Sequence, residues 1–159
     1  TKWEKEILNL NESTLYVLKK LNIHAKAKNI NLHVENIPKD LEIYFDRDGF
    51  EQIILNIVGN AVKYTPDNGN VWISVKKENH EIIISIKDDG IGIPKEDLIR
   101  IFDRFYRVDK ARTRQMGGTG LGLSIAKQIA EAHDSRIVVE SEVKKGTEVK
   151  IIIPEKEVL

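Results

Sequence analysis

The sequence predicts an α+β fold, a two-layer α/β sandwich in which about three helices cover one face of a mixed sheet of about five strands. After a first helix and a first strand, the apolar patterns follow the order β-α-β-β, a long loop, then α-β-β. The length of 159 residues suits one domain with its own core. A content of 41% hydrophobic and 31% charged residues indicates a globular chain rather than a disordered one.

Charge and cysteine content exclude several classes of protein. The 25 basic and 25 acidic side chains cancel, so the chain as a whole does not attract nucleic acid or an anionic membrane. Without cysteine it has neither a disulfide framework nor a thiolate metal site. No apolar run approaches the roughly 20 residues that span a bilayer. Because the sequence begins at Thr1 rather than Met, we expect a piece of a longer protein whose membrane anchor lies elsewhere.

Helical spacing of apolar residues predicts three helices. Leucines and an alanine at this spacing place the first over residues 12–29, with Asn11 or Ser13 as its N-cap. The second runs from about 48 to 64 and stops before Pro66, since the residue that precedes a proline disfavours helix. The third is expected over residues 120–132, with a shorter helical patch near 99–105.

Alternating apolar residues predict the strands. The clearest pair is a hairpin whose arms are joined by the polar stretch Lys77–His80. The strands are expected at about 30–34, 41–45, 71–75, 82–86, 136–141 and 147–153. The predicted organisation is a linker over 1–11, one domain over 12–155 and a tail over 156–159.

Residues 94–118 are predicted to form a lid. A loop longer than about 12–15 residues is uncommon in a compact domain and is often a binding loop. This stretch carries seven basic and four acidic residues, a local net charge of +3 in a chain with none overall. The excess suggests an anionic ligand, although for the lid considered alone a solvated surface loop is the favoured interpretation.

One face of the second predicted helix is unusually polar. Asn56, Asn60, Lys63 and Tyr64 fall within about 100° of one another at helical spacing. Asparagine is a poor helix former, so two of them on one stripe lower local stability without an obvious structural gain. An amide oxygen is a neutral, hard ligand for Mg²⁺, and a lysine one turn later can meet a phosphate. The pattern therefore predicts a polar ligand site, with a solvated helix face as the alternative.

Two glycine-containing segments complete the pattern. In the first, Asp88 ends a predicted strand, and Gly90 and Gly92 let a flat ligand approach the backbone without meeting a Cβ atom. An ordinary Asp-Gly turn is the alternative. In the second, Gly117–Ser124 leads into the third helix, where backbone N–H groups form an anion site. A flexible hinge is its alternative, and the segment matches neither a P-loop nor a dinucleotide-binding turn.

The order of these motifs is more specific than any one of them. Along the chain come Asn-x-x-x-Asn-x-x-Lys-Tyr, Asp-x-Gly-x-Gly-Ile, Phe-Asp-Arg-Phe-Tyr-Arg at 102–107, and Gly-Thr-Gly-Leu-Gly-Leu-Ser. Together they resemble the N, G1, F and G2 boxes of bacterial sensor histidine kinases, within the Bergerat-fold ATPase superfamily that includes gyrase and HSP90. The resemblance covers residues 12–154, and residues 102–122 are most similar to kinases of the phosphate- and cell-wall-sensing type.

The resemblance implies an ATP-binding site with Mg²⁺. Asp88 would recognise adenine with support from Gly90, Gly92 and Ile93, and Thr147 would assist through water. The remaining roles are implied in the same way: Asn60 as the Mg²⁺ ligand and Asn56 as its helper; Lys63, Arg104 and Arg107 as phosphate contacts; Tyr64 beside the base or ribose; and Gly118, Thr119, Gly120, Leu121, Gly122 and Leu123 as the phosphate loop. Of these, Asn56, Asn60, Lys63 and Arg107 would be catalytic.

Two turns depart from the family pattern. The family has His-Gly-Gly after the third helix, where this chain has His133-Asp134-Ser135. The later Gly-x-Gly-Thr is Lys144-Lys145-Gly146-Thr147 here. We expect altered loop geometry at both turns and no loss of ATP binding.

The resemblance also implies what the chain needs from elsewhere. Such kinases phosphorylate a histidine on a separate helical dimerisation domain, and none of His24, His33, His80 and His133 stands in that sequence context. The expected partners are therefore that domain and a response regulator, with a homodimeric, membrane-anchored parent and a monomeric fragment on the cytoplasmic side.

Two rival functions remain open at the sequence level. One is an ATPase switch module of the gyrase or chaperone type, which needs a catalytic glutamate on the second helix. Glu51 is the candidate, but helical geometry places it on the core side, away from the Asn56 stripe. The other is a degenerate nucleotide-binding scaffold, which the intact Asn60, Asp88 and Gly118–Gly122 disfavour.

Overall fold

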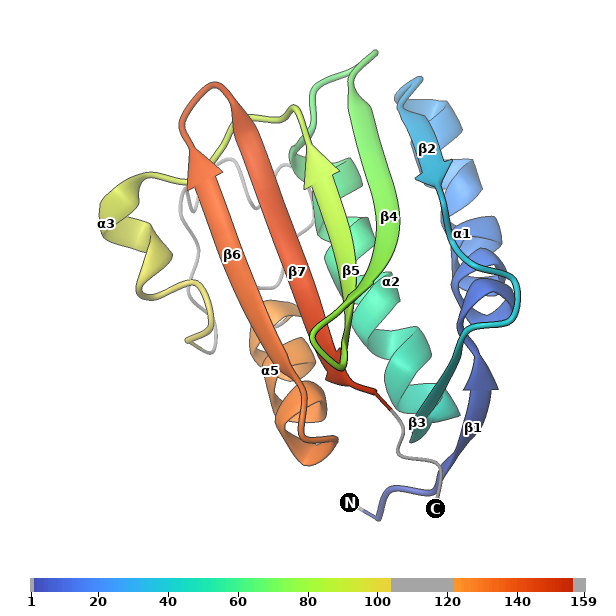
Figure 1. Ribbon diagram of the computed structural model, residues 1–159. Helices are drawn as coiled ribbons and strands as arrows, with labels where there is room; N and C mark the ends of the chain where they lie inside the picture. The colour runs from blue at the N-terminus through green and yellow to red at the C-terminus, as the bar shows by residue number, and fades with distance from the viewer. Residues whose placement is uncertain (1, 104–121, 156–159) are drawn as a thin grey trace.

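A five-stranded mixed sheet with three helices packed on one of its faces forms the body of the protein (Figure 1). The computed structural model describes residues 2–103 and 122–155. The sheet has the order β2-β4-β5-β7-β6, with β2 parallel to β4 and the other neighbours antiparallel. Its strands are β2 (Asn31–Glu35), β4 (Asn70–Glu78), β5 (Glu81–Asp88), β6 (Arg136–Glu142) and β7 (Gly146–Pro154).

The covering helices are α1 (Leu10–Ala27), α2 (Arg47–Tyr64) and α5 (Gly122–Ala132). A short helix, α3 (Lys95–Leu98), lies at the edge of the sheet near β6 (Figure 1). The predicted two-layer α+β fold is therefore confirmed. The short helix begins earlier than the patch expected at 99–105, where residues 101 and 102 form a turn. None of the helices in the described ranges has the length and apolar character that crossing a bilayer requires.

Helix α2 carries the two faces that the sequence predicts. Its N-cap is Asp46, whose side chain accepts a hydrogen bond from Gly49 N, and its last residue is Tyr64. Thr65 is extended, as expected before Pro66. The apolar face is buried against the sheet and the neighbouring helices, with Ile53, Ile54, Ile57, Val58, Ala61 and Val62 in the core. The polar stripe is left on the other face.

Helix α1 begins two residues earlier than predicted. Its N-cap is Asn9, whose side chain accepts from Glu12 N at 2.9 Å, so neither Asn11 nor Ser13 has that role. Leu18, Leu21 and Ala25 are buried as the helical spacing predicts. Leu15, by contrast, is among the exposed large apolar residues.

The predicted hairpin joins β4 and β5. Asn79 and His80 form its turn, and both have φ in the left-handed region, at 51° and 62°. This conformation suits the twist of a two-residue hairpin loop. On the face toward the helices, Ile73, Ile82 and Ile84 are buried completely, which explains the alternating pattern of the sequence.

A strand that the sequence analysis did not predict lies near the N-terminus. Within the stretch predicted as a linker, β1 (Lys5–Asn9) pairs antiparallel with β3 (Glu42–Asp46) in a separate two-stranded sheet. Glu4 N donates to Asp46 Oδ2 at 2.9 Å, so this ribbon is tied to the N-cap of α2.

Each of the two turns that depart from the family pattern has a non-glycine residue in a backbone conformation that usually favours glycine. Asp134 and Lys144 have φ of 55° and 70°, in the left-handed region. After α5, the buried His133 ring donates from Nδ1 to the Ile129 carbonyl at 2.7 Å and accepts the Asp46 N–H on Nε2 at 3.2 Å. His133 therefore joins the end of α5 to the start of α2.

Candidate functional site

Asp88 is the centre of one end of the candidate site. It is the last residue of β5, lies opposite Thr147 of β7, and is only 7% exposed. Its Oδ1 accepts hydrogen bonds from Gly90 N at 2.9 Å and Thr147 N at 3.2 Å. Burial raises the pKa of the carboxyl to about 6, against the opposing effect of these two hydrogen bonds; the neighbouring Asp89 raises it further. Asp88 is thus a desolvated carboxylate that is still ionised near neutral pH.

Gly146 brings the backbone close to Asp88, and Gly92 brings the loop after Asp88 close to Glu142. A Cβ atom added at Gly146 would lie 2.0 Å from the Asp88 carbonyl oxygen, and φ there is 113°. At Gly92, φ is 75° and an added Cβ would lie 2.1 Å from the Glu142 carbonyl oxygen. No side chain fits at either position, because the obstructing atoms belong to the backbone.

The end of α2 is joined to the loop that follows Asp88. Ile91 N donates to the Tyr64 carbonyl at 3.3 Å, and Ile93 N donates to Ser141 Oγ at 2.8 Å. The Ser141 and Thr147 hydroxyl groups are 2.8 Å apart. The predicted residues Tyr64, Ile93 and Thr147 are therefore linked to the Asp88 region through the backbone and one serine.

The second end of the candidate site lies further toward the start of α2, where α5 begins. A Cβ atom added at Gly122 would lie 3.3 Å from Asn60 Nδ2, 3.7 Å from Asn60 Oδ1 and 3.8 Å from Asn56 Cβ. The fold thus brings the last glycine of the G2-like motif against the two asparagines. Asn56, Asn60 and Lys63 are all half-buried. The Asn56 Nδ2 atom is buried without a hydrogen-bond partner among the described residues.

A metal at this end would depend on amide oxygens. Within residues 2–103 and 122–155, no group of three or more His, Cys, Asp or Glu side chains could hold a metal ion. The oxygen of an asparagine amide is a donor that Mg²⁺ accepts, and Mg²⁺ commonly completes its coordination with water and phosphate oxygens. The pair Asn56 and Asn60 fits that kind of site.

Not all of the predicted site residues can be placed. Arg104, Arg107, Gly118, Thr119, Gly120 and Leu121 lie outside the described residues, as does most of the predicted lid. Leu123 is half-buried and packs against the core. Gly92 supports the loop after Asp88 rather than Asp88 itself.

Sequence reasoning missed three contributors to the site. Gly146 precedes Thr147 in the motif that departs from the family, and this position next to a predicted site residue could have identified it. Ser141 had none, because only the β6–β7 pairing brings it to Thr147. Thr65 is fully buried beside Gly90, and its hydroxyl has no partner among the described residues.

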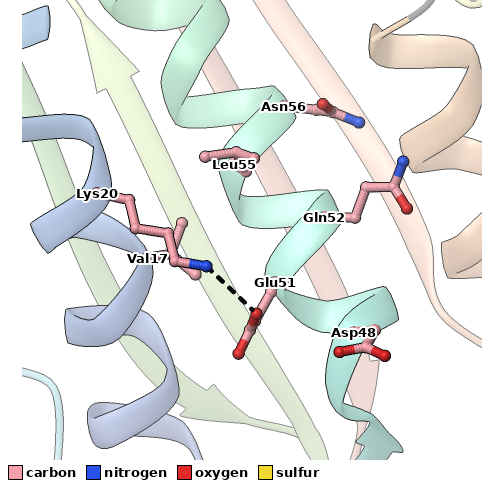
Figure 2. A pocket seen from close by; sticks show the side chains of 7 residues that line it. All are labelled: Val17, Lys20, Asp48, Glu51, Gln52, Leu55 and Asn56. Carbon is pink, nitrogen blue, oxygen red and sulfur yellow. Dashed lines mark ion pairs between the residues drawn. The ribbon is translucent and has the colours of Figure 1, made fainter.

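Glu51 does not lie in the core, as the helical projection suggested. Its side chain is 23% exposed and pairs with Lys20 of α1, with 3.9 Å between Oε2 and Nζ. Figure 2 shows this carboxylate directed toward α1 and the Asn56 amide directed away from it. The expected separation of Glu51 from the Asn56 stripe is confirmed, while its expected burial is wrong.

Comparison with known proteins identifies the family of the chain. The family model described as histidine kinase-, DNA gyrase B-, and HSP90-like ATPase matches residues 45–157. Sensor histidine kinase WalK of Bacillus subtilis (strain 168) is 50% identical over 131 residues, which are 79% of this chain and 21% of that protein. The chain therefore spans about a fifth of the length of this relative.

Two solved structures share the fold. The catalytic domain of histidine kinase ThkA superposes with a TM-score of 0.84 and 30% identity over 96% of each chain. ThkA in complex with the response regulator TrrA gives a TM-score of 0.79 and 28% identity over 96% of this chain and 42% of that one.

Proposed function

Since the chain belongs to the histidine kinase-, DNA gyrase B-, and HSP90-like ATPase family, we propose that it is the ATP-holding catalytic part of a sensor histidine kinase. In this role it binds Mg²⁺-ATP and donates the γ-phosphoryl group to a histidine on a separate domain. The observation that carries the proposal is the meeting of three motifs on one side of α2. Asp88 with its glycines lies near the end of the helix, and Asn60 with Gly122 lies further toward its start.

Asp88 suits the recognition of an adenine amino group. Both of its hydrogen bonds fall on Oδ1, so Oδ2 has no donor among the described residues. An ionised carboxylate accepts a hydrogen bond from an amino group and disfavours an approaching carbonyl oxygen. Gly90 and Gly92 let the backbone after Asp88 pass close to Tyr64, Asp88 and Glu142. We place Thr147 beside the base as its assistant, with Tyr64 and Ile93 at the margin of the base site.

The amide end suits the phosphates and Mg²⁺. Asn60 would hold the ion with help from Asn56, while Lys63 and the start of α5 at Gly122 and Leu123 face the phosphates. When bound, the ion supplies charge neutralisation for phosphoryl transfer. The proposal extends to residues outside the described ranges: Arg104, Arg107, Gly118, Thr119, Gly120 and Leu121 as phosphate contacts.

We place the phosphoryl acceptor elsewhere, because none of the four histidines of the chain stands in the phosphoacceptor sequence context. His133 is buried with both ring nitrogens hydrogen-bonded, and His33 stacks on Trp72. His80 is at the hairpin turn, at the opposite end of β5 from Asp88, and His24 is exposed on α1. The chain's contribution is to position ATP and neutralise charge, not to form a covalent intermediate.

The proposed partners follow from placing ATP binding in this chain and the phosphoryl acceptor on another domain. They are a dimerisation and phosphoacceptor domain of the same parent and a cognate response regulator, a kind of protein that ThkA binds as TrrA. We place the chain on the cytoplasmic side of a homodimeric, membrane-anchored parent.

Among the described residues, the carboxylate that the ATPase alternative would use, Glu51, does not face the amide end of the site. Hydrolysis by a switch module needs an acid that activates water beside the phosphates. Glu51 instead turns toward Lys20, and the residue one helical turn before Asn56 is the amide Gln52 (Figure 2). The arrangement therefore favours transfer to a protein histidine over hydrolysis.

The test is phosphoryl transfer with labelled ATP and Mg²⁺. The acceptor is full-length WalK of Bacillus subtilis carrying a substitution that abolishes its own ATP binding, so that any label on it comes from this chain. We expect label on this WalK only when the chain is present. Unchanged nucleotide binding by Asp88→Asn or Asn60→Ala would refute the site, and rapid release of phosphate by the chain alone would support the ATPase instead.

A further inference from the structure

Trp3 lies where the N-terminal segment meets the junction of α2 and α5. Its side chain is partly buried and packs against the hydrophobic core. The ring meets the His133 ring edge to face, with 5.3 Å between centroids, and its Cζ3 atom lies 3.3 Å from where a Cβ atom at Gly49 would be. Figure 1 shows the N-terminal segment near the end of α5 and the start of α2. Neither the sequence motifs nor the nucleotide site described above gives Trp3 a role.

Polar contacts to Asp46 hold the same junction together. Its Oδ1 accepts from Gly49 N at 2.8 Å, and its Oδ2 accepts from Glu4 N at 2.9 Å. The Asp46 N–H donates to His133 Nε2 at 3.2 Å, and the His133 ring stacks on Phe45 with 3.8 Å between centroids. The N-terminal segment, the start of α2 and the end of α5 are therefore joined at one point.

Helices α2 and α5 run antiparallel and approach each other closely at two places. At the junction, a Cβ atom added at Gly49 would lie 3.2 Å from Ile129 Cγ2. At the amide end, a Cβ atom added at Gly122 would lie 3.3 Å from Asn60 Nδ2. Gly49 and Asn60 are about 16 Å apart along the axis of α2. The position of α5 at the junction therefore influences how Gly122 lies against Asn60 at the other place.

We propose that Trp3 is a positioning residue for the amide end of the nucleotide site and acts through α5. By packing against Gly49 and the His133 ring, it holds the end of α5 on the start of α2. The start of α5 at Gly122 is then kept in the place that the phosphates and Mg²⁺ require. The inference rests on the proposed function and deepens it, because it names a residue outside the site on which phosphate binding depends.

The proposal predicts a difference between two ligands. Adenosine and ATP share the base and the ribose, but only ATP carries phosphates. Asp88, which would hold the base, takes its hydrogen bonds from Gly90 and Thr147 rather than from α5. A displacement of α5 should therefore weaken the binding of ATP and leave the binding of adenosine unchanged.

Gly49→Ala tests the junction from the side of α2. The new Cβ would lie 3.2 Å from Ile129 and 3.3 Å from Trp3, so these side chains must move away from the helix. Alanine favours helix, so α2 itself should keep its structure. The matched control is Gly59→Ala in the same helix, where a Cβ would meet only Leu21 at 3.9 Å. We expect Gly49→Ala to lower the affinity for Mg²⁺-ATP about fivefold, with adenosine affinity within about twofold, and Gly59→Ala to change neither.

Trp3→Ala tests the junction from the side of the N-terminal segment. We expect this variant to lower Mg²⁺-ATP affinity about tenfold at unchanged adenosine affinity, because the end of α5 loses its aromatic contact. Trp3→Phe should restore most of the affinity, since it keeps a ring against His133. The control is Tyr44→Ala on β3, which removes a ring that is 52% exposed and should change neither affinity.

Calorimetric titration measures Mg²⁺-ATP binding and NMR titration measures adenosine binding, each well below the thermal unfolding temperature of the variant. Normal ATP affinity in both Gly49→Ala and Trp3→Ala would overturn the role of Trp3. An equal loss of ATP and adenosine affinity would overturn it as well, because the effect would then be a general disturbance of the fold. If Trp3→Ala does not fold, Gly49→Ala decides alone. Failure of the unchanged chain to bind ATP would overturn the proposed function and this inference with it.

Discussion

The two ends of the candidate site are built differently. At the base end, Asp88 is held by two backbone N–H groups, and Gly146 leaves no room for a side chain against its carbonyl. At the amide end, the Asn56 amide nitrogen is buried without a partner among the described residues, and a Cβ atom added at Gly122 would come no closer than 3.3 Å to Asn60. The base end is fixed by the sheet, while the amide end keeps polar atoms that a ligand can satisfy.

Because the two ends are built differently, we expect substitutions at each end to affect the stability of the fold and the binding of the ligand to different degrees. Substitutions at the base end should disturb the fold as well as the ligand, since the same contacts serve both. Substitutions at the amide end should reduce binding or transfer and leave the fold intact. The Thr65 hydroxyl, which is buried and unpartnered beside Gly90, is the one described polar side-chain atom of the base end that resembles the amide end.

The largest expected effect is that of Gly146→Ala. The new Cβ would lie 2.0 Å from the Asp88 carbonyl at a φ of 113°, so the β5–β7 pairing must shift. We expect a loss of about 4 kcal/mol in the free energy of unfolding, measured with urea, because the obstructing atom is backbone.

The matched control for Gly146→Ala is Gly59→Ala in α2. A Cβ there would meet only a Leu21 methyl group at 3.9 Å. Alanine is the better helix former, so this control should be neutral or stabilising by up to about 1 kcal/mol. Equal destabilisation by both substitutions would contradict the account of the base end.

The pH dependence of stability gives the next effect. Burial raises the pKa of Asp88 to about 6, above that of an unfolded chain, so folding binds a proton more tightly. The stabilisation is complete below pH 4 and is lost as pH rises through about 6. Relative to Asp88→Asn, the unchanged chain should therefore lose up to about 3 kcal/mol between pH 4 and pH 7. Urea unfolding of both proteins at the two pH values measures this, and a constant difference would show that Asp88 is not desolvated.

The smallest effect on folding is expected for Asn56→Leu. The substitution removes a buried N–H group that has no partner among the described residues, so stability should stay equal or rise by about 1 kcal/mol. Mg²⁺-dependent ATP affinity should nevertheless fall about tenfold, because the helper amide is lost. Calorimetric titration and thermal unfolding measure the two quantities. Asn22→Leu on the exposed face of α1 is the control and should change neither; a marked loss of stability in Asn56→Leu would refute the comparison of the two ends.

The sequence predicted the parts of this fold that depend on local patterns. The end of α2 before Pro66, the buried face of that helix and the β4–β5 hairpin follow from periodicity and turn chemistry. It did not predict β1, in which only Leu8 is buried, because pairing with β3 across the length of α1 leaves little local signal.

The site shows the same limit. The residue types at Asp88, Asn56 and Asn60 suggested a ligand site, and the roles expected of them came from the resemblance to sensor histidine kinases. Contacts between distant segments had no such signal, as with Ser141 beside Thr147 and His133 beside Asp46. The Glu51 side chain points toward Lys20 because α1 packs on α2. A helical projection of α2 alone contains no information on that packing.

The measurement that tests the central claim most directly is the affinity of the chain for ATP and for GTP in the presence of Mg²⁺. The two share their phosphates, but adenine presents an amino group where guanine presents a carbonyl oxygen. If the Asp88 carboxylate reads the base, ATP should bind at least about 100-fold more tightly than GTP, a difference of about 2.7 kcal/mol. Asp88→Asn should remove most of that difference. Equal affinities for ATP and GTP in the unchanged chain would contradict the assignment of Asp88 as the base-recognising residue.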